Sequence, residues 1–117
     1  MNFETTFIKF VEDTIRSVPE YEETGVHILE DIRTRKNIDV YRCYFLNSVK
    51  NYTERITNQD DTLFTEDDMV LIRGLSLKNY WDQFSDSTKK AVWQYIQYLL
   101  LCVKYENTQQ MKDNNDN

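Results

Sequence analysis

Glycine and proline are scarce in this chain, and their scarcity limits the architectures that it can adopt. The 117 residues include two glycines, Gly25 and Gly74, and one proline, Pro19. A β-sandwich or a β-barrel needs many tight turns, and tight turns depend on these two residue types. A chain of this length forms one domain. We therefore predict an all-α fold, a single compact bundle of five or six helices, with the helical domain over residues 1–107.

Apolar residues recur at three- and four-residue spacing, which is typical of amphipathic helices. Pro19 ends the first helix, because the residue before a proline avoids the helical region, and it suits the first turn of the second. The predicted elements are Phe3–Ser17, Pro19–Lys36, Asp39–Thr57, a short element opened by Thr65 and ended by Gly74, a short helix capped by Ser76, and Lys89–Glu106.

The second predicted helix contains one of the glycines. Val26, Leu29 and Ile32 or Arg33 should form its inner face. Gly25 weakens the middle of the helix by about 1 kcal/mol relative to alanine, so a break there is possible.

The segment Lys89–Glu106 is apolar around most of its circumference, which is typical of a helix packed on several sides. We predict that it lies at the centre of the bundle, with Trp81 and Trp93 as core anchors. One helix cannot bury Tyr95 and Tyr98 on the same side as Trp93, so some tyrosines of the chain must reach the surface and form a partner-binding patch. The candidates are Tyr21, Tyr80, Tyr95, Tyr98 and Tyr105. Residues 108–117 are polar, and we predict a disordered tail there.

The charge and the cysteines restrict the class of protein. Fourteen basic and 20 acidic side chains give a net charge of −6, which disfavours general binding to nucleic acid. Cys43 and Cys102 each lie in an apolar helical stretch, so we expect buried free thiols and a reducing compartment. The longest apolar run, Val92–Val103, is too short to span a bilayer, and we expect no membrane partner.

Sequence motifs that carry known chemistry are not found. His27 is the one histidine, and the chain has no nucleophile motif, zinc-protease motif or phosphate-binding loop. A calcium-binding loop that began at Asp60 would have Phe64 at a ligand position, and no glycine would follow. We therefore predict no catalytic residues, no metal site and no cofactor.

Charge is segregated along the chain. The segment Arg33–Arg55 carries six bases and two acids, whereas Asp60–Asp68 carries five acids. The candidate partner-binding residues are Asp60, Asp61, Asp67 and Asp68 on the acidic surface and Arg33, Arg35 and Lys36 on the basic surface. Among these acids we expect a capping role only for Asp68, after Thr65. Reversing the four acids should then leave the fold intact.

Two stretches resemble small, uncharacterised helical proteins of nucleocytoplasmic large DNA viruses. The matching residues in the first half are Phe7, Phe10, Val11, Asp13, Pro19 and Glu20. Those in the second half are Leu63-Phe64, Leu71–Leu75, Tyr80-Trp81, Ser87–Lys89, Trp93, Tyr95–Gln97 and Leu99. The resemblance implies a giant-virus protein made in the host cytoplasm, and it implies no activity.

These observations favour a non-enzymatic protein-interaction module of a large DNA virus. We expect it to act in the host cytoplasm, the virus factory or the virion, with a viral or host protein as partner. The alternative is an accessory subunit of viral gene expression that contacts nucleic acid through the basic patch of Arg33–Arg55.

Overall fold

Asn2 caps the first helix by accepting a hydrogen bond from the N–H of Thr5, and Pro19 follows the end of that helix. The computed structural model describes residues 2–72 and 76–115, with side chains placed through Glu106, and it is all-α as predicted. Gly74, which we predicted to end a short element, lies outside the described residues. The elements are α1 (Phe3–Ser17), η1 (Pro19–Tyr21), α2 (Glu22–Arg35), α3 (Ile38–Val49), α4 (Thr53–Thr57), α5 (Thr62–Thr65), η2 (Leu77–Asn79), η3 (Trp81–Gln83) and α6 (Asp86–Asn115).

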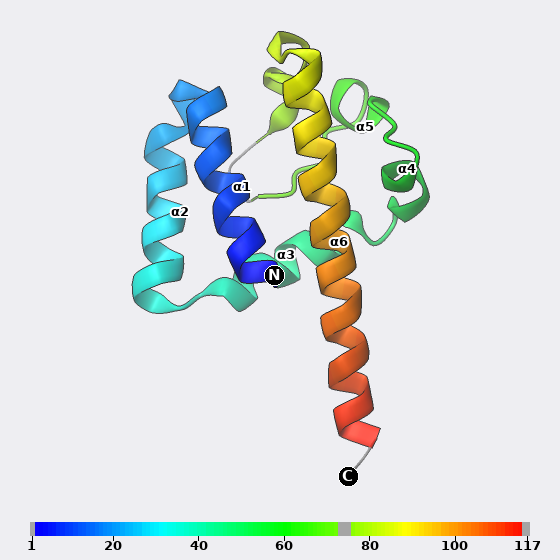
Figure 1. Ribbon diagram of the computed structural model, residues 1–117. Helices are drawn as coiled ribbons and strands as arrows, with labels where there is room; N and C mark the ends of the chain where they lie inside the picture. The colour runs from blue at the N-terminus through cyan, green and yellow to red at the C-terminus, as the bar shows by residue number, and fades with distance from the viewer. Residues whose placement is uncertain (1, 73–75, 116–117) are drawn as a thin grey trace.

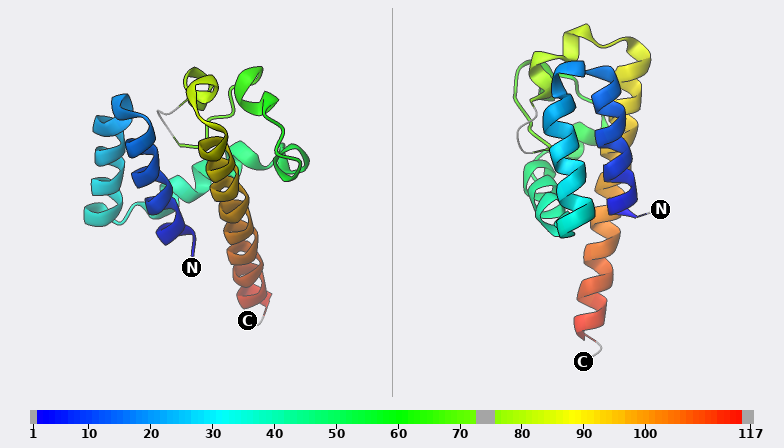
Figure 2. Two further views of the ribbon diagram at one scale, coloured as in Figure 1. Left: turned by 45° about the horizontal axis from the view of Figure 1, so that its top comes forward. Right: turned by 90° about the vertical axis from the view of Figure 1, so that its left-hand side faces the viewer.

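α1 and α6 form the spine of the molecule and run antiparallel, side by side (Figure 1). The backbone N–H of Phe3 donates to Oε1 of Glu106 at 3.3 Å, and the hydroxyl of Tyr95 donates to Asp13. α1, α3 and α4 all contact α6, which confirms the central position predicted for this helix. α2 packs on the outer side of α1, and α4 and α5 lie on the opposite side of α6 (Figure 2).

Two aromatic clusters fill the core. In one, the ring of Phe64 lies 4.6 Å from that of Trp81 and 5.2 Å from that of Trp93, and both tryptophans are buried as predicted. In the other, the ring of Phe3 lies 5.4 Å from that of Phe7 and 5.6 Å from that of Phe45. Aromatic pairs at these spacings stabilise a core beyond the area that they bury.

α2 is continuous, and its inner face differs from the predicted one. Val26 is 49% exposed, whereas Ile28, Leu29 and Ile32 are buried. Gly25 faces α1 so closely that an added Cβ would lie 2.6 Å from Cγ1 of Ile15. The glycine therefore allows α1 and α2 to approach each other, and it does not break the helix.

Four predicted elements differ from the structure. The second predicted helix, Pro19–Lys36, opens with the 3-10 turn η1, and α2 begins at Glu22. The helix expected over Asp39–Thr57 is divided into α3 and α4, because the chain turns where the N–H of Tyr52 donates to the carbonyl of Val49. Thr65 ends α5 and does not open an element. The short helix after Ser76 is replaced by two 3-10 turns, η2 and η3.

α6 also extends further than predicted. We expected its end near Glu106, but the helix continues to Asn115 and projects beyond the other helices (Figures 1 and 2). No proline or glycine interrupts residues 86–115, so the local sequence does not stop the helix. The disordered tail over 108–117 and the domain boundary at 107 stay predictions.

Candidate functional site

Two of the four acidic candidates, one in the turn between α4 and α5 and one just after α5, pair with Arg55 of α4. Nε of Arg55 lies 2.9 Å from Oδ2 of Asp60, and Nη1 lies 2.9 Å from Oδ2 of Asp67. Nη2 of Arg55 also donates to Oγ1 of Thr62 at 2.7 Å. Hydrogen bonds from Thr62 and from Arg55 lower the pKa of Asp60 below its usual value. Asp60 and Asp67 are therefore brought together, and they close this turn.

The other two acids also have internal partners. Oδ1 of Asp61 accepts a hydrogen bond of 2.8 Å from Nε1 of Trp93, and Oδ1 of Asp68 accepts one of 2.7 Å from Oγ of Ser76. The expectation of a capping role for Asp68 alone was wrong, because Thr65 ends α5, Asp68 bonds Ser76 and Asp61 bonds Trp93. Sequence spacing gives no sign of this contact between α6 and a turn 32 residues earlier.

The basic candidates lie at the end of α2, on the opposite side of the molecule from α4 and α5 (Figure 1). Nη2 of Arg33 lies 3.9 Å from Oε1 of Glu12 on α1. Lys36 caps the helix in the left-handed region, with a φ of 54°. The structure therefore does not bring the acidic and basic candidates together.

The wider basic segment is not one continuous patch. Nε of Arg42 lies 2.9 Å from Oε2 of Glu106, in an ion pair that is not aligned as a hydrogen bond. The guanidinium of Arg42 lies over the ring of Phe3. Arg42 also contacts Asp39, and Arg55 is paired with Asp60 and Asp67. Arg33 and Arg35 lie 3.9 Å and 3.6 Å from the carboxylates of Glu12 and Asp31, so four of the six bases have acidic partners. This pairing weakens the electrostatic footprint that nucleic acid would need.

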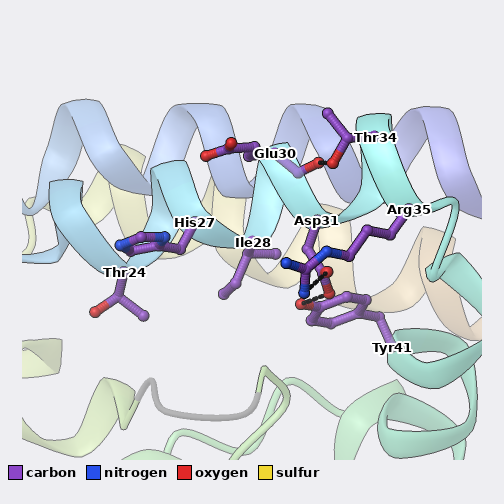
Figure 3. Close-up of a pocket in the computed structure, with 8 residues that line it drawn as sticks. All are labelled: Thr24, His27, Ile28, Glu30, Asp31, Thr34, Arg35 and Tyr41. Carbon is purple, nitrogen blue, oxygen red and sulfur yellow. Dashed lines mark hydrogen bonds and ion pairs between the residues drawn. The ribbon is translucent and has the colours of Figure 1, made fainter.

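A polar hollow of about 570 Å³ lies along α2 and reaches α3 (Figure 3). The side chains that the hollow exposes are those of Thr24, His27, Ile28, Glu30, Asp31, Thr34, Arg35 and Tyr41. Oδ2 of Asp31 accepts a hydrogen bond of 3.1 Å from the hydroxyl of Tyr41, and Oδ1 accepts one of 3.1 Å from Nδ2 of Asn37. Oδ1 also lies 3.6 Å from Nη1 of Arg35. Asp31 is therefore already engaged in joining α2 to α3.

His27 lies one helical turn before Asp31 on α2, and it is exposed. The figure shows its ring at the end of the hollow away from the Asp31 cluster (Figure 3). Oγ1 of Thr34, a second hydroxyl in the hollow, donates to the carbonyl of Glu30. We find no arrangement here that pairs a nucleophile with a base, among the described residues.

Apolar side chains are exposed along one face of α6. Tyr98 is 38% exposed, Leu101 is 64% exposed and Tyr105 is 66% exposed, at a spacing of three and four residues. We call these three residues the α6 stripe. The prediction that tyrosines reach the surface is confirmed for Tyr98 and Tyr105, whereas Tyr21 is buried. Leu101 was missed, although the spacing from 98 to 105 would have placed it on the same face.

Three hollows follow each other beside the α6 stripe, between α6 and α1. The first, of about 270 Å³, lies against the stripe itself and is lined by Asn2, Tyr98, Leu101, Cys102, Tyr105 and Glu106. The next, of about 340 Å³, is lined by Thr6, Lys9, Asp13, Ala91, Gln94, Tyr95 and Tyr98. The third is a slot of about 50 Å³ that shares Asp13, Ala91 and Tyr95 with the second. We call these three hollows together the α1–α6 groove.

Tyr95 fixes the middle of the α1–α6 groove. Its hydroxyl donates to Asp13, which also pairs with Arg16 at 2.5 Å, and its ring packs 5.3 Å from that of Phe10. Partial burial, together with the hydrogen bond to Asp13, raises the pKa of Tyr95 to about 12. The phenol therefore stays neutral at ordinary pH and holds α6 against α1.

The cysteines and the charged side chains supply no metal site in the described part of the chain. Cys43 and Cys102 are free thiols, but Cys43 is exposed on α3 and Cys102 is half-buried on α6, whereas we expected both to be buried. Across residues 2–72 and 76–106, no group of three or more His, Cys, Asp and Glu side chains is placed to hold a metal ion. None of the described helices combines the length and the apolar character that a bilayer span requires.

Comparisons of this chain with protein-family models, with curated proteins and with solved structures found no match.

Proposed function

We propose that this protein is a protein-interaction module that binds its partner through the α6 stripe and the adjoining α1–α6 groove. One observation carries the proposal. Tyr98, Leu101 and Tyr105 are three of the five large apolar side chains exposed in the described part of the molecule, and they lie on one face of one helix. Single exposed apolar residues are common on protein surfaces, but a contiguous set beside a groove is typical of a binding site.

The composition of the stripe supports a protein partner. Tyrosine presents a large apolar ring with a polar edge and is enriched at protein interfaces. Leu101 lies between the two tyrosines, where an apolar side chain would be excluded from water by its neighbours once a partner binds. Residues at this spacing on a helix match the contacts that a second helix makes when it lies alongside.

The charged candidates support this proposal less well. Asp60, Asp61, Asp67 and Asp68 have internal partners, so their first role is to hold the turn between α4 and α5 and the segment that follows it. Arg42 and Arg55 are neutralised as well, and we therefore favour the protein-binding function over contact with nucleic acid. A viral origin and a place in the host cytoplasm remain part of the proposal on the basis of the sequence resemblance alone.

Affinity capture with matched variants tests the proposal. Leu101→Lys combined with Tyr105→Lys places two charges in the stripe, whereas Val40→Lys changes an equally exposed residue on α3, 59% exposed. Both variants should keep the wild-type helix content and melting temperature, because all three side chains are largely outside the core. Proteins recovered from a lysate of the source cells by the wild type and by Val40→Lys should be lost with the stripe variant.

Recovery of the same proteins at the same yield by all three baits would show that the stripe is not the binding surface.

A further inference from the structure

The helix that carries the stripe continues past the rest of the molecule. α6 runs to Asn115, and its last turns project beyond the other helices (Figures 1 and 2). A helix end without packing is marginal in water, because most helical stability in proteins comes from a covered face. We propose that the α6 stripe and this projecting segment are covered by a second copy of the chain, with the two α6 helices antiparallel. This inference rests on the proposed function and names its partner.

An interface around a two-fold axis must be complementary to itself, and the α6 stripe has the required spacing. Tyr98 and Tyr105 are equally far from a point between residues 101 and 102. An antiparallel pair centred there places Tyr98 near Tyr105 of the second copy, and it places Leu101 of both copies at the axis. The same geometry repeats on the other side of the axis, so that both stripes are covered at once.

The projecting segment then has a place to lie. Residues 107–115 extend about 13 Å as a helix. In the antiparallel pair they run beside Gln94 and Ala91 of the second copy, which line the 340 Å³ hollow of the α1–α6 groove. With Tyr98 opposite Tyr105, residues 107–115 lie opposite residues 96–88 of the second copy, a stretch of the same length of about 13 Å.

Charge does not oppose this pairing, although the whole chain carries a net charge of −6. The charged side chains in the groove are Lys9, Asp13 and Glu106. Asp13 is paired with Arg16, and Glu106 is paired with Arg42. Each face is thus close to neutral, so two identical faces meet without strong repulsion.

The size of the interface predicts a reversible dimer. The exposed parts of the three stripe residues amount to on the order of 300 Å² in each copy, judged from their exposed fractions and the area of such side chains. The two copies together bury about 600–700 Å² from the stripe, to which the projecting segment adds, and stable complexes bury about 1,200–2,000 Å². We therefore expect monomer at low concentration and dimer at high concentration.

Sedimentation equilibrium of the full chain tests the inference. Over a range from about 5 µM to about 500 µM, the mass of the wild type and of Val40→Lys should rise from 14.2 kDa toward twice that value, by mass action. The stripe variant, Leu101→Lys with Tyr105→Lys, should stay at 14.2 kDa throughout. Circular dichroism should show both variants folded, and it should show helix content rising with concentration in the wild type.

Cross-linking through single cysteines tests the antiparallel direction. In a Cys43→Ser, Cys102→Ser background, Leu101→Cys should form an intermolecular disulfide readily, because it lies at the axis. Gln94→Cys should not form one, because in the antiparallel pair position 94 of one copy lies about 22 Å along the helix axis from position 94 of the other.

A wild type that stays monomeric over the whole concentration range would overturn the inference, and so would a dimer that the stripe variant retains. Disulfide formation at both cysteine positions would contradict the antiparallel arrangement. These results are separate from the proposed function. A monomeric wild type whose captured partner is lost with the stripe variant would exclude self-pairing and would leave the binding surface in place.

Discussion

The hydrogen bond between Asp61 and Trp93 makes an acidic side chain on the surface necessary for the core. Trp93 is 2% exposed, and its indole N–H donates to Oδ1 of Asp61 at 2.8 Å. Replacing Asp61 with alanine leaves this donor with water as its only alternative partner. A hydrogen bond to a charged acceptor contributes about 1.5–3 kcal/mol. Since Asp61 itself is exposed, solvent restores part of this, and we expect a loss of about 1–2 kcal/mol.

Urea unfolding followed by tryptophan fluorescence measures this loss. Glu66→Ala is the matched control, because Glu66 is an exposed acid five residues away, and it should change the free energy of unfolding by less than about 0.5 kcal/mol. In a Trp93→Phe background the donor is absent, so Asp61→Ala should then cost no more than the control. Equal effects of Asp61→Ala and Glu66→Ala in the wild-type background would refute the reasoning.

Three further predictions concern packing, ionisation and the thiols. Gly25→Ala should lower the free energy of unfolding in urea by about 1 kcal/mol, because the added Cβ would meet Ile15. In an Ile15→Ala background, where this clash is absent, Gly25→Ala should stabilise the protein through the higher helix propensity of alanine. The pKa of Tyr95 is raised to about 12 from a usual value of 10.0. Between pH 10 and pH 12 the unfolded chain therefore binds fewer protons than the folded chain, and the free energy of unfolding should fall as the pH rises through this range. Tyr95→Phe should make that fall in melting temperature shallower, and an unchanged slope would contradict the assignment. Cys43 should react faster with a disulfide reagent than Cys102, because burial raises the pKa of the Cys102 thiol, and the intact mass should show no bridge before or after reduction.

The local pattern of the sequence was sufficient for the fold class and for the helices with one clear apolar stripe. α1 begins and ends at the predicted residues, and α6 lies at the centre with Trp93 in the core. The predicted inner face of α2 was wrong because Gly25 carries no side chain and was left out of the apolar pattern. Counting it gives buried positions 25, 28, 29 and 32, which is the ordinary spacing of a helix face.

The contacts between distant parts of the chain could not be predicted. The Arg55 cluster and the Asp61–Trp93 bond depend on how α4, α5 and α6 meet, and a run of acids is equally typical of a solvated loop. The α6 stripe was predicted only as a set of tyrosines. Periodicity shows that a helix is apolar on most sides, but it does not show which side the other helices leave open.

The packing of α1 against α6 has a consequence for synthesis on the ribosome. About seventy residues separate the end of α1 at Ser17 from the start of α6 at Asp86, which takes about 3–14 s to translate. During that interval α1 can pair with α2 through Ile15 and Gly25, and its Phe3 can pack on Phe45 of α3, but Phe10 lacks the ring of Tyr95. Part of the aromatic face of α1 therefore stays uncovered until the last helix is made, and an exposed apolar surface of this kind is what chaperones bind.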